Sequence, residues 1–96
     1  MKINLNRYNG TVKVSLDGRL DTTTAPEFET FIEKNHDGKS PLVIDCEKLS
    51  YISSAGLRVL LSTHKKTKGN MKLANVCELV MEVLEMTGFS DILVIE

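Results

Sequence analysis

The sequence predicts a small α/β domain with a mixed β-sheet, in the element order β-β-α-β-α-β-α-β and with helices mainly on one face. The chain opens with two alternating segments joined by Asn9-Gly10, the strongest dipeptide signal for a tight hairpin. Three helix-like segments then alternate with three strand-like ones, which indicates right-handed crossovers between strands of one sheet. Because 96 residues suffice for one core but not two, we expect a single domain over residues 1–96.

The first two strands are predicted from strict alternation of apolar and polar residues over residues 2–6 and 11–16. Asp17-Gly18 interrupts the second alternation, so we expect that strand to end there.

The first helix is expected over residues 25–35. Thr24 and Glu27 have the spacing of a capping box, and Pro26 is tolerated in a first turn. The buried stripe is expected to be Phe28, Phe31 and Ile32.

The next strand and helix are joined by a segment that carries two serines, Ser53 and Ser54. Residues 41–46 form an unbroken apolar run, typical of a strand buried on both faces. Apolar spacing then predicts a helix over residues 55–68, closed by Gly69-Asn70. The expected buried stripe of this helix is Leu57, Leu60, Leu61 and His64. Ser53 or Ser54 stands where this helix begins, and serine is a favoured N-cap residue.

The remaining elements follow the same logic. Residues 71–74 read as a short strand, and Asn75 with Glu78 forms a second capping-box pattern. Gly88 is expected to end the third helix, and residues 92–95 to form the last strand. The third helix should bury Val76, Leu79, Val80, Val83 and Leu84.

Composition excludes several classes of protein. With 12 basic and 13 acidic residues the net charge is −1, which gives no basic face for nucleic acid. No apolar run approaches the roughly 20 residues that cross a bilayer, so we expect a soluble cytoplasmic protein that does not bind membranes. Cys46 and Cys77 lie far apart in the sequence and are expected to be free thiols.

A serine at a helix start is most often only a cap, but the same place tolerates an anion. A serine hydrolase is disfavoured because the Gly-x-Ser-x-Gly pattern is absent around Ser54. His36 and His64 fall near helix ends, away from the serines, and no metal-ligand cluster stands out. We therefore expect no catalytic residue, no metal and no cofactor.

The run from Tyr51 to Leu61 resembles the signature of STAS domains, and specifically of bacterial anti-sigma factor antagonists. The resemblance extends to the turn at 18–21 and to the ending at 87–89, so it covers nearly the whole chain. It implies the STAS fold and makes Ser54 the phosphorylation site, with Ser53 as the second choice. Ser53 stands where many members of that family have Asp.

The resemblance also implies a site and its partners. The turn beginning at Asp21 and the helix start near Asn75 are expected to lie close to the serines. The spacing of the second helix places Arg58, Ser62 and Lys65 on its outer face. Taken alone, an exposed arginine such as Arg58 is best interpreted as a solvated surface charge. The expected partner-binding residues are Asp21, Thr24, Ser53, Ser54, Gly56, Leu57, Arg58, Ser62 and Lys65.

In the implied scheme, a chain that is monomeric when free binds an anti-sigma factor that is also a serine kinase, and phosphorylation of Ser54 separates them. A metal-dependent serine phosphatase restores the unphosphorylated form, and nucleotide and metal belong to the partners. The output is transcription or, in some relatives, secretion. The alternative is a STAS accessory subunit of a transporter complex that uses the same helix without phosphorylation.

Overall fold

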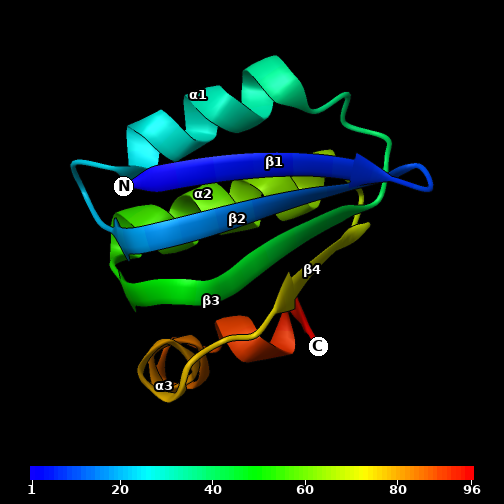
Figure 1. The fold of residues 1–96 in the computed structure, drawn as a ribbon. Helices are drawn as coiled ribbons and strands as arrows, with labels where there is room; N and C mark the ends of the chain where they lie inside the picture. Colours follow the sequence, from blue (N-terminus) through cyan, green and yellow to red (C-terminus); the bar gives the residue numbers. More distant parts are fainter.

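The computed structural model describes residues 1–96, folded as five strands, three α-helices and one short 3-10 helix (Figure 1). The strands are β1 (Lys2–Tyr8), β2 (Thr11–Leu20), β3 (Leu42–Ile52), β4 (Met71–Ala74) and β5 (Val94–Ile95). The helices are α1 (Ala25–Asn35), α2 (Ser54–Lys66), α3 (Glu78–Met86) and the 3-10 helix η1 (Phe89–Asp91).

The sheet has the strand order β1-β2-β3-β4-β5, with β1 antiparallel to β2 and all other neighbours parallel. Because the strands follow chain order, the three crossovers advance in one direction. Crossovers of the same hand then place their helices on one side of the sheet. In Figure 1 no helix crosses in front of β1, β2 or β3, while α2 runs behind β1 and β2. The predicted mixed α/β fold is confirmed.

The hairpin between β1 and β2 is as predicted. Tyr8 pairs with Thr11, and Asn9 and Gly10 have φ values of 49° and 77°. Two successive positive φ values are those of a type I′ turn, whose twist matches that of the strands it joins.

Two strands are longer than predicted. The β2 strand does not end at Asp17-Gly18: an irregularity in register lies there, Gly18 has φ 120°, and pairing with β3 resumes up to Leu20 and Ile52. The strand predicted over residues 41–46 likewise continues, as β3, to Ile52. The alternation pattern failed because a bulge changes which residues face the core without ending the ladder.

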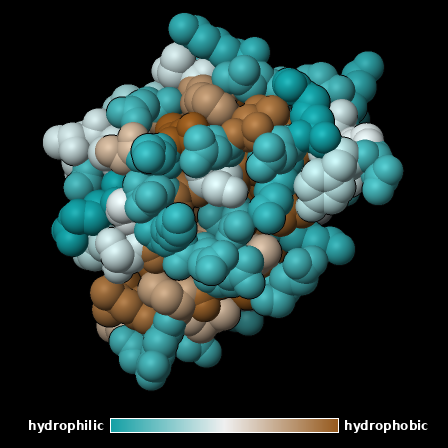
Figure 2. All heavy atoms as spheres, in the orientation of Figure 1, coloured by the Kyte–Doolittle hydropathy of each residue, from teal (hydrophilic) through white to brown (hydrophobic).

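The core lies between the covered face of the sheet and the helices. It takes alternate residues of β2 up to Leu16 and of β3 up to Cys46, as pleated strands require, and the spacing widens beyond the irregularity in register. Its sheet residues are Val12, Val14, Leu16, Leu20, Leu42, Ile44, Cys46, Leu49, Ile52, Met71 and Leu73. The other face of the sheet is mainly hydrophilic, as the middle of Figure 2 shows.

The uncovered face of β3 holds a buried carboxylate. Asp45 is only 8% exposed; it lies 3.4 Å from Lys13 Nζ and accepts hydrogen bonds from Asn75 Nδ2 at 3.0 Å and Glu47 N at 3.1 Å. Burial opposes ionisation of Asp45, but the hydrogen bonds from Asn75 and Glu47 and the charge of Lys13 hold its pKa below the usual value. The second face of this strand is thus closed by a polar network rather than by a helix.

The first helix has the predicted bounds, but its capping box is absent. The side chain of Thr24 makes no cap bond; its Oγ1 donates to Arg19 O at 2.7 Å and accepts from Asp21 N at 2.9 Å. The hydroxyl is taken by the preceding turn, which competes for it with the helix amides. Phe28 and Ile32 are buried and Phe31 is half-buried.

In α2 the buried stripe is rotated relative to the prediction. Leu57 and Leu60 are buried as expected and Leu61 and His64 are half-buried, but Val59 and Thr63 also lie inside. Crossing the sheet beside α1, the helix buries a broader face than a single i, i+3, i+4 row. Gly69, with φ 83°, follows the helix and donates its N–H to His64 O at 2.9 Å.

The third helix begins later than its capping-box pattern suggested. Asn75 has φ 57° and uses its side chain on Asp45, so Cys77 is the N-cap residue and makes no side-chain cap bond. Of the expected stripe, Val80 and Leu84 are buried, but Leu79 is 51% exposed. Gly88 ends the helix with φ 80° as predicted, whereas η1 and a two-residue β5 replace the predicted strand over 92–95.

Candidate functional site

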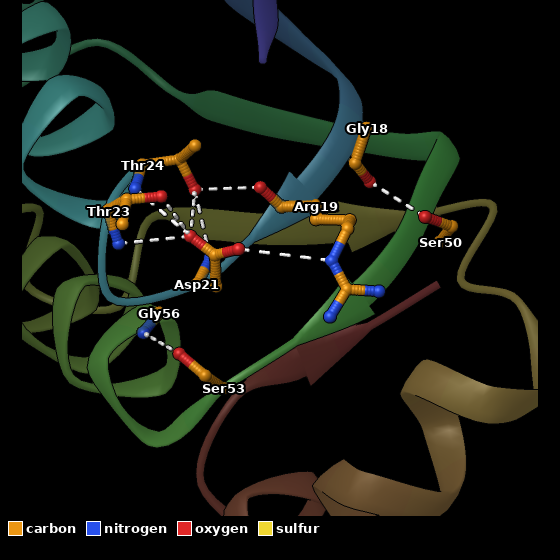
Figure 3. A network of polar contacts seen from close by, with 8 residues as sticks. All are labelled: Gly18, Arg19, Asp21, Thr23, Thr24, Ser50, Ser53 and Gly56. Atoms are coloured by element: carbon orange, nitrogen blue, oxygen red, sulfur yellow. Dashed lines mark hydrogen bonds and ion pairs between the residues drawn. The ribbon is translucent and has the colours of Figure 1, made fainter.

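The site forms where the carboxyl ends of β2 and β3 meet. Parallel pairing continues to Leu20 and Ile52, and Ser53 N then donates to Leu20 O at 2.9 Å. This bond places the turn that begins at Asp21 beside the first turn of α2, as Figure 3 shows. Loops at the carboxyl ends of parallel strands are where α/β sheets usually place their sites.

The two serines have different structural roles. Ser53 is the N-cap of α2, with φ −103° and ψ 176°, and its hydroxyl accepts from Gly56 N at a long 3.5 Å. Ser54 is the first helical residue and is exposed, whereas Ser53 is half-buried. The cap and the accessible hydroxyl are therefore on neighbouring residues, a division that the sequence left open.

Gly56 is fixed by a close approach of the backbone. A Cβ atom at this position would lie 2.8 Å from Leu20 Cγ, 2.9 Å from Leu20 O and 3.0 Å from Ile52 Cγ1. Because one of these neighbours is a main-chain oxygen, no rotamer change relieves the contact. The absent side chain of Gly56 is what lets the end of β2 lie against the first turn of α2.

The neighbouring turn is held by one carboxylate. Asp21 Oδ1 accepts from Thr23 Oγ1 at 2.7 Å, from Thr23 N at 3.0 Å and from Thr24 N at 3.2 Å. The hydrogen bond from the Thr23 hydroxyl, helped by the two amides, holds the pKa of Asp21 below its usual value. The turn therefore presents an ionised carboxylate next to the serine-bearing helix start.

Arg19 joins this turn to the end of β3. Its Nε lies 3.8 Å from Asp21 Oδ2, and its guanidinium lies over the Tyr51 ring, 4.1 Å from the centroid. The sequence alone did not indicate that Arg19 and Tyr51 are neighbours, because only the parallel register of β2 and β3 brings them together.

The outer face of α2 is only partly as predicted. Arg58 and Lys65 are exposed and Ser62 is half-buried. Leu57, expected among the partner-binding residues, is 4% exposed and packs in the core, so it supports the helix rather than offering a contact surface. Gly56 is also buried.

A pocket of about 270 Å³ lies between the starts of α1 and α2, one turn from Ser54. Arg58 and Ala55 line one side, and Pro26 and Glu29 line the other. The pocket was not predicted from the sequence, because its two walls come from helices that β3 separates along the chain.

The connection that begins at Asn75 runs along β3 toward its carboxyl end. The side chain of Asn75 contacts Asp45, in the middle of β3, and is not beside the serines. Cys77, the N-cap residue of α3, lies nearer to them: its Sγ is 3.5 Å from Leu49 O, three residues before the end of β3.

Neither histidine lies near Ser54. His64 lies ten residues further along α2, about 15 Å at the helical rise. His36 is at the end of α1, where its ring bonds Ser40 O and Gly38 N. Burial raises the pKa of the Cys46 thiol to about 12, so it is no thiolate nucleophile.

The structure contains no group of three or more His, Cys, Asp or Glu side chains arranged to hold a metal ion. None of its helices combines the length and the apolar character that crossing a membrane requires.

The fold agrees with the comparisons with known proteins. The STAS domain family model matches residues 2–96, so the chain belongs to the STAS domain family. Within that family it is similar to anti-sigma factor antagonists. BtrV of Bordetella bronchiseptica, whose name places it in that group, is 34% identical over 96 residues, covering 96% of this chain and 83% of BtrV.

Two other relatives show the same pattern. The anti-sigma-B factor antagonist of Bacillus subtilis is 26% identical over 96 residues, covering 97% of this chain and 88% of that protein. Among solved structures, Bacillus SpoIIAA in its phosphorylated form has a TM-score of 0.71 at 19% identity, over 99% of this chain and 91% of that one. The predicted family and fold are confirmed, and the sequence relatives carry the names of regulators rather than of enzymes.

Proposed function

We propose that this protein is a phosphorylation-controlled anti-sigma factor antagonist that binds a kinase-type anti-sigma factor and leaves it when Ser54 is phosphorylated. The observation that carries this proposal is the exposed hydroxyl of Ser54 at the first residue of α2. Its neighbour Ser53 already serves as the cap, so modification of Ser54 removes no bond that starts the helix.

The helix start is a suitable place for the added charge. Phosphoserine carries about −1.5 to −2 charges and three acceptor oxygens. The first amides of α2 have no acceptor within the helix, and its dipole favours an anion there by about 0.3–1 kcal/mol. The fold therefore accommodates the phosphate.

A docked partner meets the same charge differently. The Asp21 carboxylate lies beside the helix start, so a partner that covers both residues would have to bury a dianion near another anion. Such a loss of complementarity is costly, and about 2.8 kcal/mol already weakens binding a hundredfold. A local change of charge thereby becomes release of the partner.

The chemistry belongs to the partners. The kinase would transfer the γ-phosphoryl group of ATP to Ser54 Oγ, with loss of the hydroxyl proton and release of ADP. A metal-dependent serine phosphatase would hydrolyse the phosphoserine and restore the binding form. The partner surface proposed on this chain is the Asp21–Thr24 turn, Ser53, Ser54 and the exposed Arg58 and Lys65, with Ser62 at its edge.

The test uses the kinase-type anti-sigma factor encoded nearest to this protein. With ATP, intact-mass analysis should show one added phosphate on the wild type and on Ser53→Ala, and none on Ser54→Ala. Ser54→Asp should bind the kinase at least about tenfold more weakly than Ser54→Ala.

Equal modification of Ser54→Ala, together with wild-type affinity of Ser54→Asp, would overturn the proposal. Stable co-purification with a transporter component and no phosphate under any condition would instead support an accessory subunit of a transporter complex.

A further inference from the structure

We propose that Arg58 is the intramolecular partner of phosphorylated Ser54, closing an ion pair along α2 that removes the guanidinium from the docking surface. The inference rests on the proposed function, because that function supplies the phosphate on Ser54. It adds Arg58 to the regulated site and explains how phosphorylation would change the docking surface. Ser54 and Arg58 are four residues apart on one helix, and both are exposed.

The direction of the pair is the favourable one. Residues i and i+4 are neighbours on a helix surface, and helical side chains lean toward the amino end. Arg58 thus leans toward Ser54 rather than away from it. An anion at the first residue and a cation one turn later is also the order that the helix dipole favours.

Arg58 is free to make this contact. The four ion pairs of the molecule join other residues, and Arg58 belongs to none of them. The other arginine near the site, Arg19, is held over the Tyr51 ring and beside Asp21. Lys65 lies eleven residues from Ser54, about 16 Å along the helix, and cannot reach a phosphate there.

Pairing with the phosphate would change the pocket that Arg58 lines. In the unphosphorylated protein Arg58 lines the pocket between α1 and α2, opposite Pro26 and Glu29. A guanidinium fork binds phosphate oxygens in a bidentate manner. Pairing with the phosphate takes Arg58 out of the pocket wall, so phosphorylation changes both the shape and the charge of the surface next to Ser54.

The experiment measures the effect of Arg58 on the phosphate titration and needs no partner protein. Phosphoserine is incorporated at position 54 by genetic encoding, and the second phosphate ionisation is followed by phosphorus NMR in wild type, Arg58→Gln and Lys65→Gln. Because Arg58 favours the dianion, its loss should raise the phosphate pKa by a few tenths of a unit. Lys65→Gln, which removes the same charge from the same helix, should leave the titration at the wild-type value.

A phosphate pKa in Arg58→Gln equal to that in wild type and Lys65→Gln would overturn the pairing. Restoration of the wild-type value by Arg58→Lys would support it through charge, and an intermediate value would show the part played by the guanidinium fork. Failure of the kinase to modify Ser54 would sink the proposed function without affecting this titration, so the two failures are distinguishable.

Discussion

Two positions in the first turn of α2, Ser54 and Gly56, meet opposite requirements. Ser54 must be open to solvent if an enzyme is to reach it, and it is exposed. Gly56 must be closed against the end of β2, because Leu20 O lies where a side chain would begin. The exposed hydroxyl is thus held by a buried residue two positions later, which fixes the helix start against the sheet.

Gly56→Ala should destabilise the protein by about 1–3 kcal/mol, since overpacking displaces backbone or strains side chains. Urea unfolding at neutral pH measures the loss. Lys65→Ala, a change of an exposed residue on the same helix, serves as the control and should stay within about 0.5 kcal/mol. Equal urea midpoints for Gly56→Ala and wild type would mean that Leu20 does not constrain this turn.

At the scale of elements, two connections are fixed by hydrogen bonds to a carboxylate. The β2–α1 turn is closed on Asp21, and the connection after β4 is tied to β3 by Asn75 and Asp45. In both places a side chain that the local pattern assigned to a helix cap is used elsewhere: Thr24 bonds within the preceding turn, and Asn75 bonds to β3. For Asn75 the hydrogen bond to the Asp45 carboxylate outweighs a cap bond, because charge-assisted bonds are stronger.

The Asp21 turn should make stability depend on pH. Its folded-state pKa is lowered by the Thr23 hydroxyl and the two amides, so the contribution is present above the unfolded pKa of about 3.9 and is lost as pH falls through the folded value. Asp21→Asn should therefore be less stable than wild type at pH 7, and the difference should shrink below about pH 4.

Urea unfolding at several pH values between 7 and 3 measures this change, with exposed Glu82→Gln as the control. A stability difference between wild type and Asp21→Asn that stays constant over the whole range would contradict the role given to the carboxylate.

Asn75 should keep the Asp45 carboxyl ionised. Asn75→Gly retains the left-handed backbone at φ 57° but removes the amide donor, so the pKa of Asp45 should rise and stability should fall by about 1–3 kcal/mol. Carboxyl carbon NMR reports the titration directly. Asn75→Ala should be less stable still, because it also strains the backbone by about 1–2 kcal/mol. An unchanged Asp45 titration in Asn75→Gly would show that this hydrogen bond is not significant.

At the scale of the whole molecule, the sheet order equals the chain order and the helices cover one face. The serine junction lies at the rim of this assembly, outside the continuous core. A charge added at the rim reaches solvent and a docked partner but not the interior. This separation is what lets a regulator change its binding without unfolding.

Ser54→Glu should accordingly stay folded. Its free energy of unfolding should rise by about 0.3–1 kcal/mol, and its urea midpoint with it, because the acid faces the positive end of α2. Lys65→Glu is the matched variant: it places an acid in the last turn of the same helix, where the dipole is unfavourable, and should lower stability by a similar amount. Loss of cooperative unfolding in Ser54→Glu would contradict the claim that the fold tolerates an anion at this position.

Local patterns predicted the elements well and their connections poorly. Asn9-Gly10, the bounds of α1 and the glycine ends of α2 and α3 follow from backbone preferences that act within a few residues. The bulge near Gly18, the extension of β3 to Ile52 and the roles of Thr24 and Asn75 depend on partners 5 to 32 residues away. The partners of Ser50 and Asn75 lie about 30 residues away, beyond any local window, and the bond of Thr24 to Arg19 depends on a turn that the capping pattern does not include.

The sequence by itself determined the fold class, the family resemblance and the presence of a serine pair at a strand-to-helix junction, because periodicity and capping are short-range effects. Only the tertiary structure decided which serine is the cap and which is exposed, that Val59 and Thr63 are also buried, and that Arg58 lines a pocket with residues of α1. These depend on how β2 and α1 pack against the start of α2, and packing is set by long-range contacts that the order of residues does not display.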